Sequence, residues 1–344
     1  DYGITHSGFG FGGVFTDYDN DGDLDILVNH DFGYKNVPNK FYENNYPDED
    51  FEEISEKIKM ALPTNAMGTG VGDYNNDGFL DYYITNIKAG FLMTNHGPGK
   101  PLVNMTGTSG VKINKILDTS GGHTPVSWGA NFADFDNDGD LDLFVSNGCL
   151  NPYIDANPDF FFENVNGLFV NKSKDVNLYN ASIGRGSVVF DYDNDGDLDL
   201  LIVEQEPVES FPGAQGTLLF RNDSSKGNWI KIALYGVDQD KNGIGSRVEI
   251  SVGKKKFIRE IDGGSSHSSQ NSVIAHFGLG TADHVDTIRV KWLGGKEQVI
   301  VNQKANQLIK ITENNNGKKE VNRLWYLLLA IPVIIIAWFY FRAK

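Results

Sequence analysis

The sequence predicts an all-β protein made of four similar repeats, a second β domain and one C-terminal membrane helix. Three observations predict this organisation. A nine-residue, aspartate-rich loop occurs four times, starting at residues 17, 73, 134 and 191, which is a spacing of 56, 61 and 57 residues. A short apolar run rich in β-branched and aromatic residues follows each copy directly. The C-terminal end of the 344-residue chain contains an apolar stretch of helical length.

Each loop carries side-chain oxygens at positions 1, 3, 5 and 9, a backbone carbonyl at position 7 and a glycine at position 6. Calcium takes six or more hard oxygen ligands, and glycine permits the sharp turn between them. Magnesium fits less well, because it keeps more of its own waters. The sequence therefore predicts four calcium sites. Their residues are Asp17, Asp19, Asp21, Asp23 and Asp25; Asp73, Asn75, Asp77, Phe79 and Asp81; Asp134, Asp136, Asp138, Asp140 and Asp142; and Asp191, Asp193, Asp195, Asp197 and Asp199.

The main alternative for these loops is the EF-hand, which needs a bidentate Glu at position 12 and a helix on each side. Position 12 is instead apolar in every copy: Val28, Ile84, Val145 and Ile202. Each loop is therefore expected to enter a strand. A second alternative is that these are simply acidic hairpin turns, but four copies in the same register favour metal sites.

The charge balance supports the metal sites. The chain has 46 acidic and 30 basic residues, a formal charge of −16, and 18 of its aspartates lie in the four loops. Without metal, neighbouring carboxylates repel one another, so about four bound Ca²⁺ ions should order the loops and stabilise the fold. The negative charge also argues against nucleic acid as a partner, because phosphate backbones need clustered Lys and Arg.

Two further elements recur in the repeats. Phe41–Asn44, Leu92–Asn95, Phe161–Asn164 and Leu219–Asn222 each read as a strand that ends in an Asn turn. A third strand follows in three of the repeats, and small residues such as Gly68 and Gly70 lead into the next loop. About four short strands per repeat are typical of a propeller blade. Four blades are few for closure, so the set is either incomplete at its start or a compact or open form.

In the sequence of their loops and strands, the repeats resemble the FG-GAP or VCBS type, which is found in integrin-like propellers and secreted bacterial proteins. The resemblance implies calcium-binding roles for Asp17, Asp19, Asp21 and Asp25 and for their counterparts. The second copy departs from the pattern at Asn75, which removes one charge and should weaken that site. Phe79 at position 7 should not weaken the site, because position 7 binds calcium through its backbone carbonyl.

The pattern of residues changes near Asn228, after the last aspartate loop. Glycine turns such as Gly243-Ile-Gly and His276-Phe-Gly-Leu-Gly separate alternating strands such as Thr287–Trp292. This part closely resembles the ASPIC/UnbV domain, which follows such repeats in the cartilage-acidic-protein-like family and has no secure biochemical activity. The alternation itself predicts a β-sandwich, or an extra sheet on the last blade.

The predicted organisation is repeats over residues 1–226, the ASPIC/UnbV domain over 227–313, a polar stalk over 314–323 and a transmembrane helix over 324–341. The span has Trp and Tyr residues at both ends, as interfacial girdles do. A buried core helix is the weaker alternative, because it would rarely be apolar on all sides. Such loops fill at extracellular or periplasmic calcium concentrations, so the long N-terminal part is expected outside the cell and the short C-terminus inside.

No catalytic constellation is evident in the sequence. Cys149 is the one cysteine, so the chain forms no internal disulfide, and His267 and His276 are better explained as structural residues near glycine turns. We therefore expect a membrane-anchored interaction, adhesion or accessory protein that binds protein or glycan partners at the cell surface, or a subunit of a membrane complex. The alternative is an enzyme that processes extracellular polysaccharide or peptide on a propeller scaffold.

Overall fold

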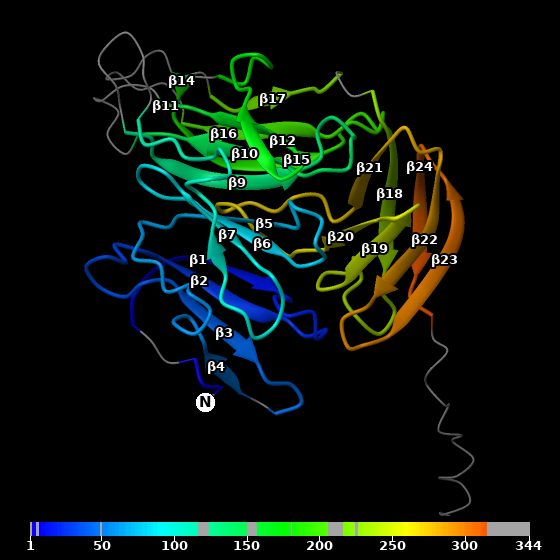
Figure 1. Cartoon of the computed structure of the whole chain (residues 1–344), viewed down its shortest axis with the longest axis horizontal. Helices are drawn as coiled ribbons and strands as arrows, with labels where there is room; N and C mark the ends of the chain where they lie inside the picture. The colour runs from blue at the N-terminus through cyan, green and yellow to red at the C-terminus, as the bar shows by residue number, and fades with distance from the viewer. Residues whose placement is uncertain are drawn as a thin grey trace, which may run out of the picture.

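The computed structural model describes residues 2–4, 7–48, 50–115, 124–149, 157–179, 181–205, 216–223 and 226–314. All of the secondary structure in these residues is β, which confirms the predicted class (Figure 1). No helix within them has the length and apolarity needed to cross a membrane. The predicted span 324–341, and the predicted stalk beyond Asn314, lie outside the described residues.

Four antiparallel sheets follow one another along the first part of the chain, here called the repeat region. The first contains β1 (Phe9–Thr16), β2 (Asp25–Asp31), β3 (Lys40–Asn44) and β4 (Phe51–Glu53). The second contains β5 (Thr69–Gly72), β6 (Asp81–Ile84), β7 (Phe91–Thr94) and β8 (Val103–Asn104). The third contains β9 (Ser127–Ala133), β10 (Asp142–Asn147), β12 (Phe160–Val165) and β13 (Leu168–Asn171). The fourth contains β15 (Gly184–Phe190), β16 (Asp199–Glu204) and β17 (Leu218–Phe220), and a small pair joins β11 (Asn157–Pro158) to β14 (Ala181–Ser182).

The strands confirm the predicted position of each loop. Every loop ends at the first residue of a strand, which is β2, β6, β10 or β16. The Asn-terminated element forms the next strand of its sheet, and the third predicted element adds a fourth strand in the first three sheets. Within β10 every residue is buried, as expected for a strand covered on both faces.

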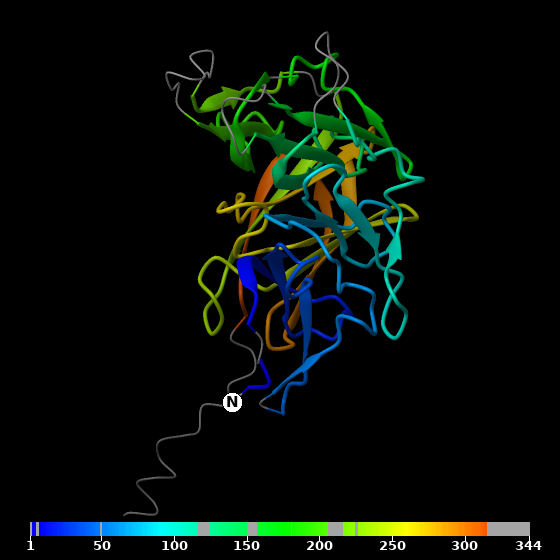
Figure 2. The same ribbon diagram turned by 90° about the vertical axis from the view of Figure 1, so that its left-hand side faces the viewer.

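Neighbouring sheets share apolar cores, so none is an independent unit. Leu27 of the first sheet packs in one cluster with Tyr82 and Ile84 of the second. Leu92 of the second sheet similarly shares a cluster with Leu143 and Phe162 of the third, and the third and fourth sheets share a further cluster. Both views show the sheets in chain order, with the first at one end and the fourth at the other (Figures 1 and 2).

Glycines at the start of the second sheet allow its first strand, β5, to pack closely against β9, the first strand of the third sheet. A Cβ on Gly68 would lie 2.4 Å from the carbonyl oxygen of Trp128 and 2.5 Å from that of Ser266. A Cβ on Gly70 would lie 3.1 Å from the carbonyl oxygen of Ala130. The glycines that precede the second loop in the sequence therefore let β5 approach β9 at backbone distance.

The rest of the described chain, here called the C-terminal region, forms two sheets around one core. One sheet has the order β21 (Ala275–Gly280), β18 (Asn228–Tyr235) and β24 (Gln307–Thr312), with β18 and β24 parallel. The other has the order β20 (Lys255–Glu260), β19 (Arg247–Val252), β22 (His284–Lys291) and β23 (Glu297–Lys304). Side chains from both sheets, such as Ile232 and Val290, belong to a single buried cluster.

Residues 262–274, between β20 and β21, leave the C-terminal region and cross the innermost strands of the repeat region (yellow in Figure 1). The N–H of Ser266 donates to the carbonyl oxygen of Thr69 in β5 at 2.6 Å, and its Oγ accepts from the N–H of Ala130 in β9 at 3.0 Å. Farther along, Oδ1 of Asn271 accepts from the N–H of Val189 in β15 at 2.9 Å. This segment therefore ties the two parts of the molecule together.

Candidate metal centre

Each aspartate loop connects the first strand of a sheet in the sequence (β1, β5, β9 or β15) to the second (β2, β6, β10 or β16). Two of its residues have positive φ in all four copies. The glycine at position 6 has φ between 92° and 102°, and the asparagine at position 4 has φ between 56° and 69°. Glycine and asparagine adopt this left-handed conformation at the lowest cost. The four loops therefore share one backbone path, and this confirms the predicted turn at glycine.

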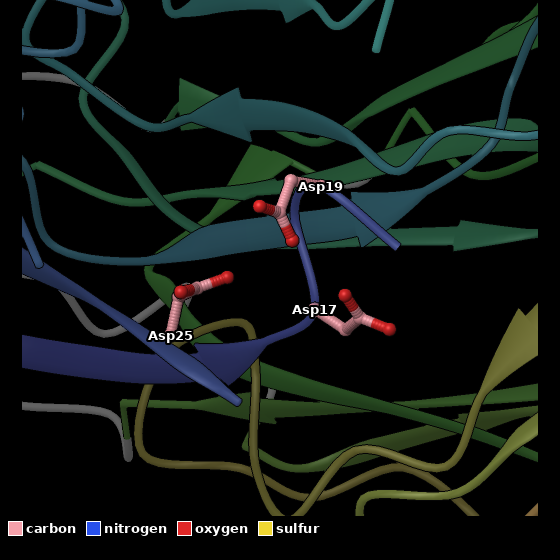
Figure 3. A group of neighbouring side chains, drawn as sticks. All are labelled: Asp17, Asp19 and Asp25. Carbon is pink, nitrogen blue, oxygen red and sulfur yellow. The ribbon is translucent and has the colours of Figure 1, made fainter. Parts of the chain in front are cut away.

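Three of the four loops bring carboxylates close together among the described residues. In three copies, carboxylate oxygens of three residues lie within 4.8 Å of one another: Asp17, Asp19 and Asp25; Asp134, Asp136 and Asp138; and Asp191, Asp193 and Asp199. Figure 3 shows the first group, with Asp17 and Asp19 at the start of the loop and Asp25 at the start of β2. The other predicted ligands of these three loops are outside the groups, and so are those of the second loop: Asp21, Asp23, Asp140, Asp142, Asp195 and Asp197, and Asp73, Asn75, Asp77, Phe79 and Asp81.

The second copy differs at position 3. Its Asn75 accepts a hydrogen bond on Oδ1 from the N–H of Asp77 at 3.0 Å, as Asp136 does from Asp138 at 3.2 Å in the third copy. Asn75 also donates from Nδ2 to Oδ2 of Asp77 at 3.2 Å. The second loop therefore keeps the backbone arrangement of the others with one fewer negative charge.

The position-9 aspartate closes each loop in the same way. Oδ2 of Asp25 accepts from the N–H of Tyr18 at position 2 (3.0 Å), and Oδ1 accepts from the N–H of Asn44 at the end of β3 (2.9 Å). The same pair of bonds recurs at the equivalent residues Asp81, Asp142 and Asp199. Position 9 therefore anchors the loop to the end of the third strand.

The position-1 aspartate has one oxygen directed to the turn. Oδ2 accepts from the N–H of the position-6 glycine at 3.0 Å in Asp73 and Asp134 and at 2.9 Å in Asp191. Oδ1 of Asp17 and Oδ1 of Asp191 are buried without a hydrogen-bond partner among the described residues. A buried carboxylate oxygen normally has a partner, so a cation in the loop would satisfy these atoms. The donor set fits calcium.

Burial and mutual repulsion change the acidity of the loops. Burial, together with the charges of Asp19 and Asp23, raises the pKa of Asp25 to about 9, although the backbone hydrogen bonds from Asn44 and Tyr18 act against that rise. The pKa of Asp134 rises to about 7, mainly through burial, and that of Asp19 rises to about 6 through burial and the charge of Asp21. Burial and mutual repulsion thus make it costly to keep these carboxylates charged without a partner, and a divalent cation would supply the missing positive charge.

Position-4 asparagines link the loops in a row. Nδ2 of Asn20 donates to the carbonyl oxygen of Gly78 in the second loop at 3.0 Å. Nδ2 of Asn76 donates to Oδ1 of Asp140 in the third loop at 2.8 Å. The third loop reaches the fourth in the same manner, from Asn137 to Asp197 at 3.0 Å. In the third and fourth loops the position-7 aspartate therefore accepts the hydrogen bond from the preceding loop. In the second loop position 7 is Phe79, and the backbone carbonyl of Gly78 accepts instead.

Two family models match the sequence that forms this structure. The model described as an FG-GAP-like repeat matches residues 17–84, which contain the first two loops. The model described as ASPIC and UnbV matches residues 236–318, which contain most of the C-terminal region. The chain thus contains an FG-GAP-like repeat and an ASPIC/UnbV domain.

Curated relatives agree with this assignment. Cartilage acidic protein 1 of Homo sapiens is 28% identical over 276 residues, which are 76% of this chain and 38% of that protein. The Mus musculus protein of the same name is 27% identical over 259 residues, 71% of this chain and 36% of the relative. The chain thus spans less than two fifths of the length of these relatives.

Solved structures are more distant. A lectin of Agrocybe aegerita that recognises non-reducing terminal N-acetylglucosamine aligns with 61% of this chain and 52% of its own, at 18% identity and a TM-score of 0.30. A biofilm matrix protein of V. cholerae aligns with 86% of this chain and 59% of its own, at 12% identity and a TM-score of 0.30. These scores are too low to establish a shared fold.

The C-terminal region lies against the row of loops, which the sequence did not predict. Oε2 of Glu260 accepts from the N–H of Asp17 at 2.9 Å, and Lys231 forms an ion pair with Asp191. His276, which the sequence analysis explains as a structural residue, donates from Nε2 to the carbonyl oxygen of Gly196 in the fourth loop at 2.9 Å. Burial lowers the pKa of His276 to about 4, so the ring is neutral.

Proposed function

We propose that this protein is an extracellular calcium-binding interaction protein whose repeat region holds about four calcium ions. The convergence of carboxylate oxygens within 4.8 Å in three loops is the observation that supports it best. Positions 1, 3, 5 and 9, with the carbonyl at position 7, would provide the ligands. When bound, the ion would neutralise these carboxylates and fix the turns. The second site, with Asn75, would be the weakest.

The architecture proposed for this function is a propeller-like array followed by a β-sandwich-like domain. Four antiparallel sheets that share cores in chain order support the first part, and two sheets around one core support the second. An array of this kind presents broad, rigid faces. Calcium would rigidify the face on which the loops lie.

The proposed role is binding rather than catalysis, with protein or glycan partners at the cell surface. Relatives named cartilage acidic protein support an extracellular setting, as does the calcium concentration that such loops need. The apolar stretch 324–341 would anchor the chain in a membrane, alone or as an accessory subunit of a larger assembly.

The proposal is tested by thermal unfolding of the purified full chain in 1 mM calcium and after chelation. A site with a dissociation constant one hundredth of the calcium concentration stabilises the folded state by about 2.7 kcal/mol. We expect a lower midpoint after chelation, and a smaller calcium effect in Asp19→Asn. Asp175→Asn, at an exposed position outside the loops, is the control. Equal midpoints with and without calcium would contradict the proposal.

Binding is tested separately. The full chain, loaded with calcium, is applied to arrays of extracellular glycans and matrix proteins and to a panel of labelled polysaccharides and peptides. Retention without product release would support an interaction protein. Turnover of a polymer in the panel would favour an enzyme instead.

A further inference from the structure

We propose that calcium binding and docking of the C-terminal region onto the loops form one linked equilibrium, in which the C-terminal region positions the first aspartate of the loops. The inference rests on the proposed calcium binding and extends it. It predicts that calcium stabilises the interface between the two parts of the molecule as well as the loops themselves.

The third and fourth loops show how the first aspartate is shared. Oδ2 of Asp134 accepts from two N–H groups, that of Gly139 within the loop at 3.0 Å and that of Gly278 in β21 at 2.9 Å. Oδ2 of Asp191 accepts from the N–H of Gly196 and is paired with Nζ of Lys231 in β18. Oδ1 of Asp191 has no partner among the described residues and is available to an ion. In the fourth loop one oxygen thus serves the interface while the other is open to an ion, and in the third loop Oδ1 of Asp134 accepts from the N–H of Asp138 at 3.1 Å.

The first loop is held in a similar way from β19 and β20. The N–H of Asp17 donates to Oε2 of Glu260 at 2.9 Å. Nη1 of Arg247 lies 3.8 Å from Oδ2 of Asp17 and also contacts Oδ1 of Asn20, the residue that reaches the second loop. Oδ1 of Asp17 is buried without a partner among the described residues. Oδ2 of Asp17 therefore faces the C-terminal region while Oδ1 is open to an ion, as in Asp191.

Arg259 adds a positive charge beside the third loop, where it lines the same cavity as Asp134. Its guanidinium donates to the carbonyl oxygens of His276 at 3.1 Å and Ile258 at 2.8 Å, and these bonds fix its position. The first, third and fourth loops therefore each face a charged or hydrogen-bonding group of the C-terminal region.

The interface has little space to absorb movement of a loop. A Cβ on Gly278 would lie 2.2 Å from Oδ2 of Asp134 and 2.5 Å from Cα of Asn137. A Cβ on Gly196 would lie 1.9 Å from the Trp229 ring. If a metal ion holds the carboxylate of Asp134 or Asp191 where it now lies, the same carboxylate also pairs with Gly278 or Lys231 across the interface. By linkage, each event then favours the other by the same factor, typically between about fivefold and 150-fold.

The test is hydrogen–deuterium exchange of the full chain with calcium and with chelator, combined with measurement of bound calcium. We expect calcium to slow exchange in the loops and, by about tenfold or more, in β20 and β21 at the interface. Exchange in β23, the outer strand of its sheet, should not change. Protection confined to the loops would overturn the linkage and leave the proposed calcium sites intact. Absence of both bound calcium and protection would overturn both proposals.

Gly278→Ala tests the same inference without altering a loop residue. The added methyl group has no room beside Asp134, so calcium affinity at the third site should fall about tenfold and the calcium-dependent protection of β21 should be lost. Gly107→Ala is the control, because a Cβ there meets no atom within 4 Å. Wild-type calcium affinity and protection in Gly278→Ala would overturn the proposal. The exchange data on the unmodified chain decide the matter even if this variant fails to fold.

Discussion

Replacement of Asn164 by alanine should be one of the most destabilising changes of a single polar residue in the repeat region. Nδ2 of Asn164 donates to the carbonyl oxygens of Tyr74 in the second loop (2.8 Å) and Leu141 in the third (2.9 Å), and Oδ1 accepts from the N–H of Gly167 (2.7 Å). The side chain is buried, so alanine would leave three polar groups without this partner. At about 1–2 kcal/mol for each of the three lost bonds, Asn164→Ala should cost about 3–6 kcal/mol.

The repeat itself supplies the matched control. Asn44 ends β3 as Asn164 lies near the end of β12, but among the described residues its Nδ2 reaches only the carbonyl oxygen of Leu24 in its own loop, at 3.2 Å. Asn44→Ala should therefore cost about 1 kcal/mol. Urea unfolding at a fixed calcium concentration measures both values. Equal losses of unfolding free energy would refute the idea that the asparagine stabilises the contact between neighbouring sheets.

Three further predictions concern other parts of the molecule. Gly196→Ala should destabilise the fold by at least about 3 kcal/mol, because φ is 101° and the methyl group would overlap the Trp229 ring, whereas Gly22→Ala, with φ of 95° and open space, should cost about 1–2 kcal/mol in the same thermal scans. Equal costs would show that the contact with Trp229 is not tight. Burial alone would raise the pKa of Glu313, but hydrogen bonds from Lys296 and from the N–H groups of residues 237–239 outweigh it and lower the pKa to about 2. Its contribution should be complete above the ordinary pKa of 4.5 and decline as the pH falls toward 2; Glu313→Gln should lose about 2–3 kcal/mol at pH 7 and less near pH 2, and a loss independent of pH would contradict this. Asn75→Asp restores the missing charge of the second loop, so competition with a chromophoric chelator should show about tenfold tighter binding at one site, and unchanged affinity would show that charge does not limit it.

Local features of the sequence were sufficient to predict the repeats. The runs after each loop, such as Ile26–Val28, are short, β-branched and bounded by turn residues, and they form strands where expected. Glycine at position 6 requires positive φ, and the structure has it at each copy. Gly68 and Gly70 were expected only to lead into the next loop, and the structure shows that they admit a neighbouring strand.

The contacts between distant segments could not be predicted in this way. Asn95 was expected only to end a strand, but its Nδ2 donates to the carbonyl oxygen of Tyr18, 77 residues earlier. Arg247 and Asn20 are separated by 227 residues, and each looks like an ordinary surface residue in its own sequence context. No periodicity encodes such pairs, because they depend on how two folded parts meet. A basic residue within an apolar strand, as Lys231 is between Ile230 and Ile232, is a sequence signal that could have indicated a surface facing the loops.

The most direct test of the calcium sites is a crystal structure of the calcium-loaded protein with anomalous diffraction data. We predict an anomalous peak in each loop, with oxygen ligands at about 2.3–2.6 Å from positions 1, 3 and 5, and the weakest peak in the loop that contains Asn75. Loops that keep their hydrogen bonds and show no peak at millimolar calcium would contradict the account.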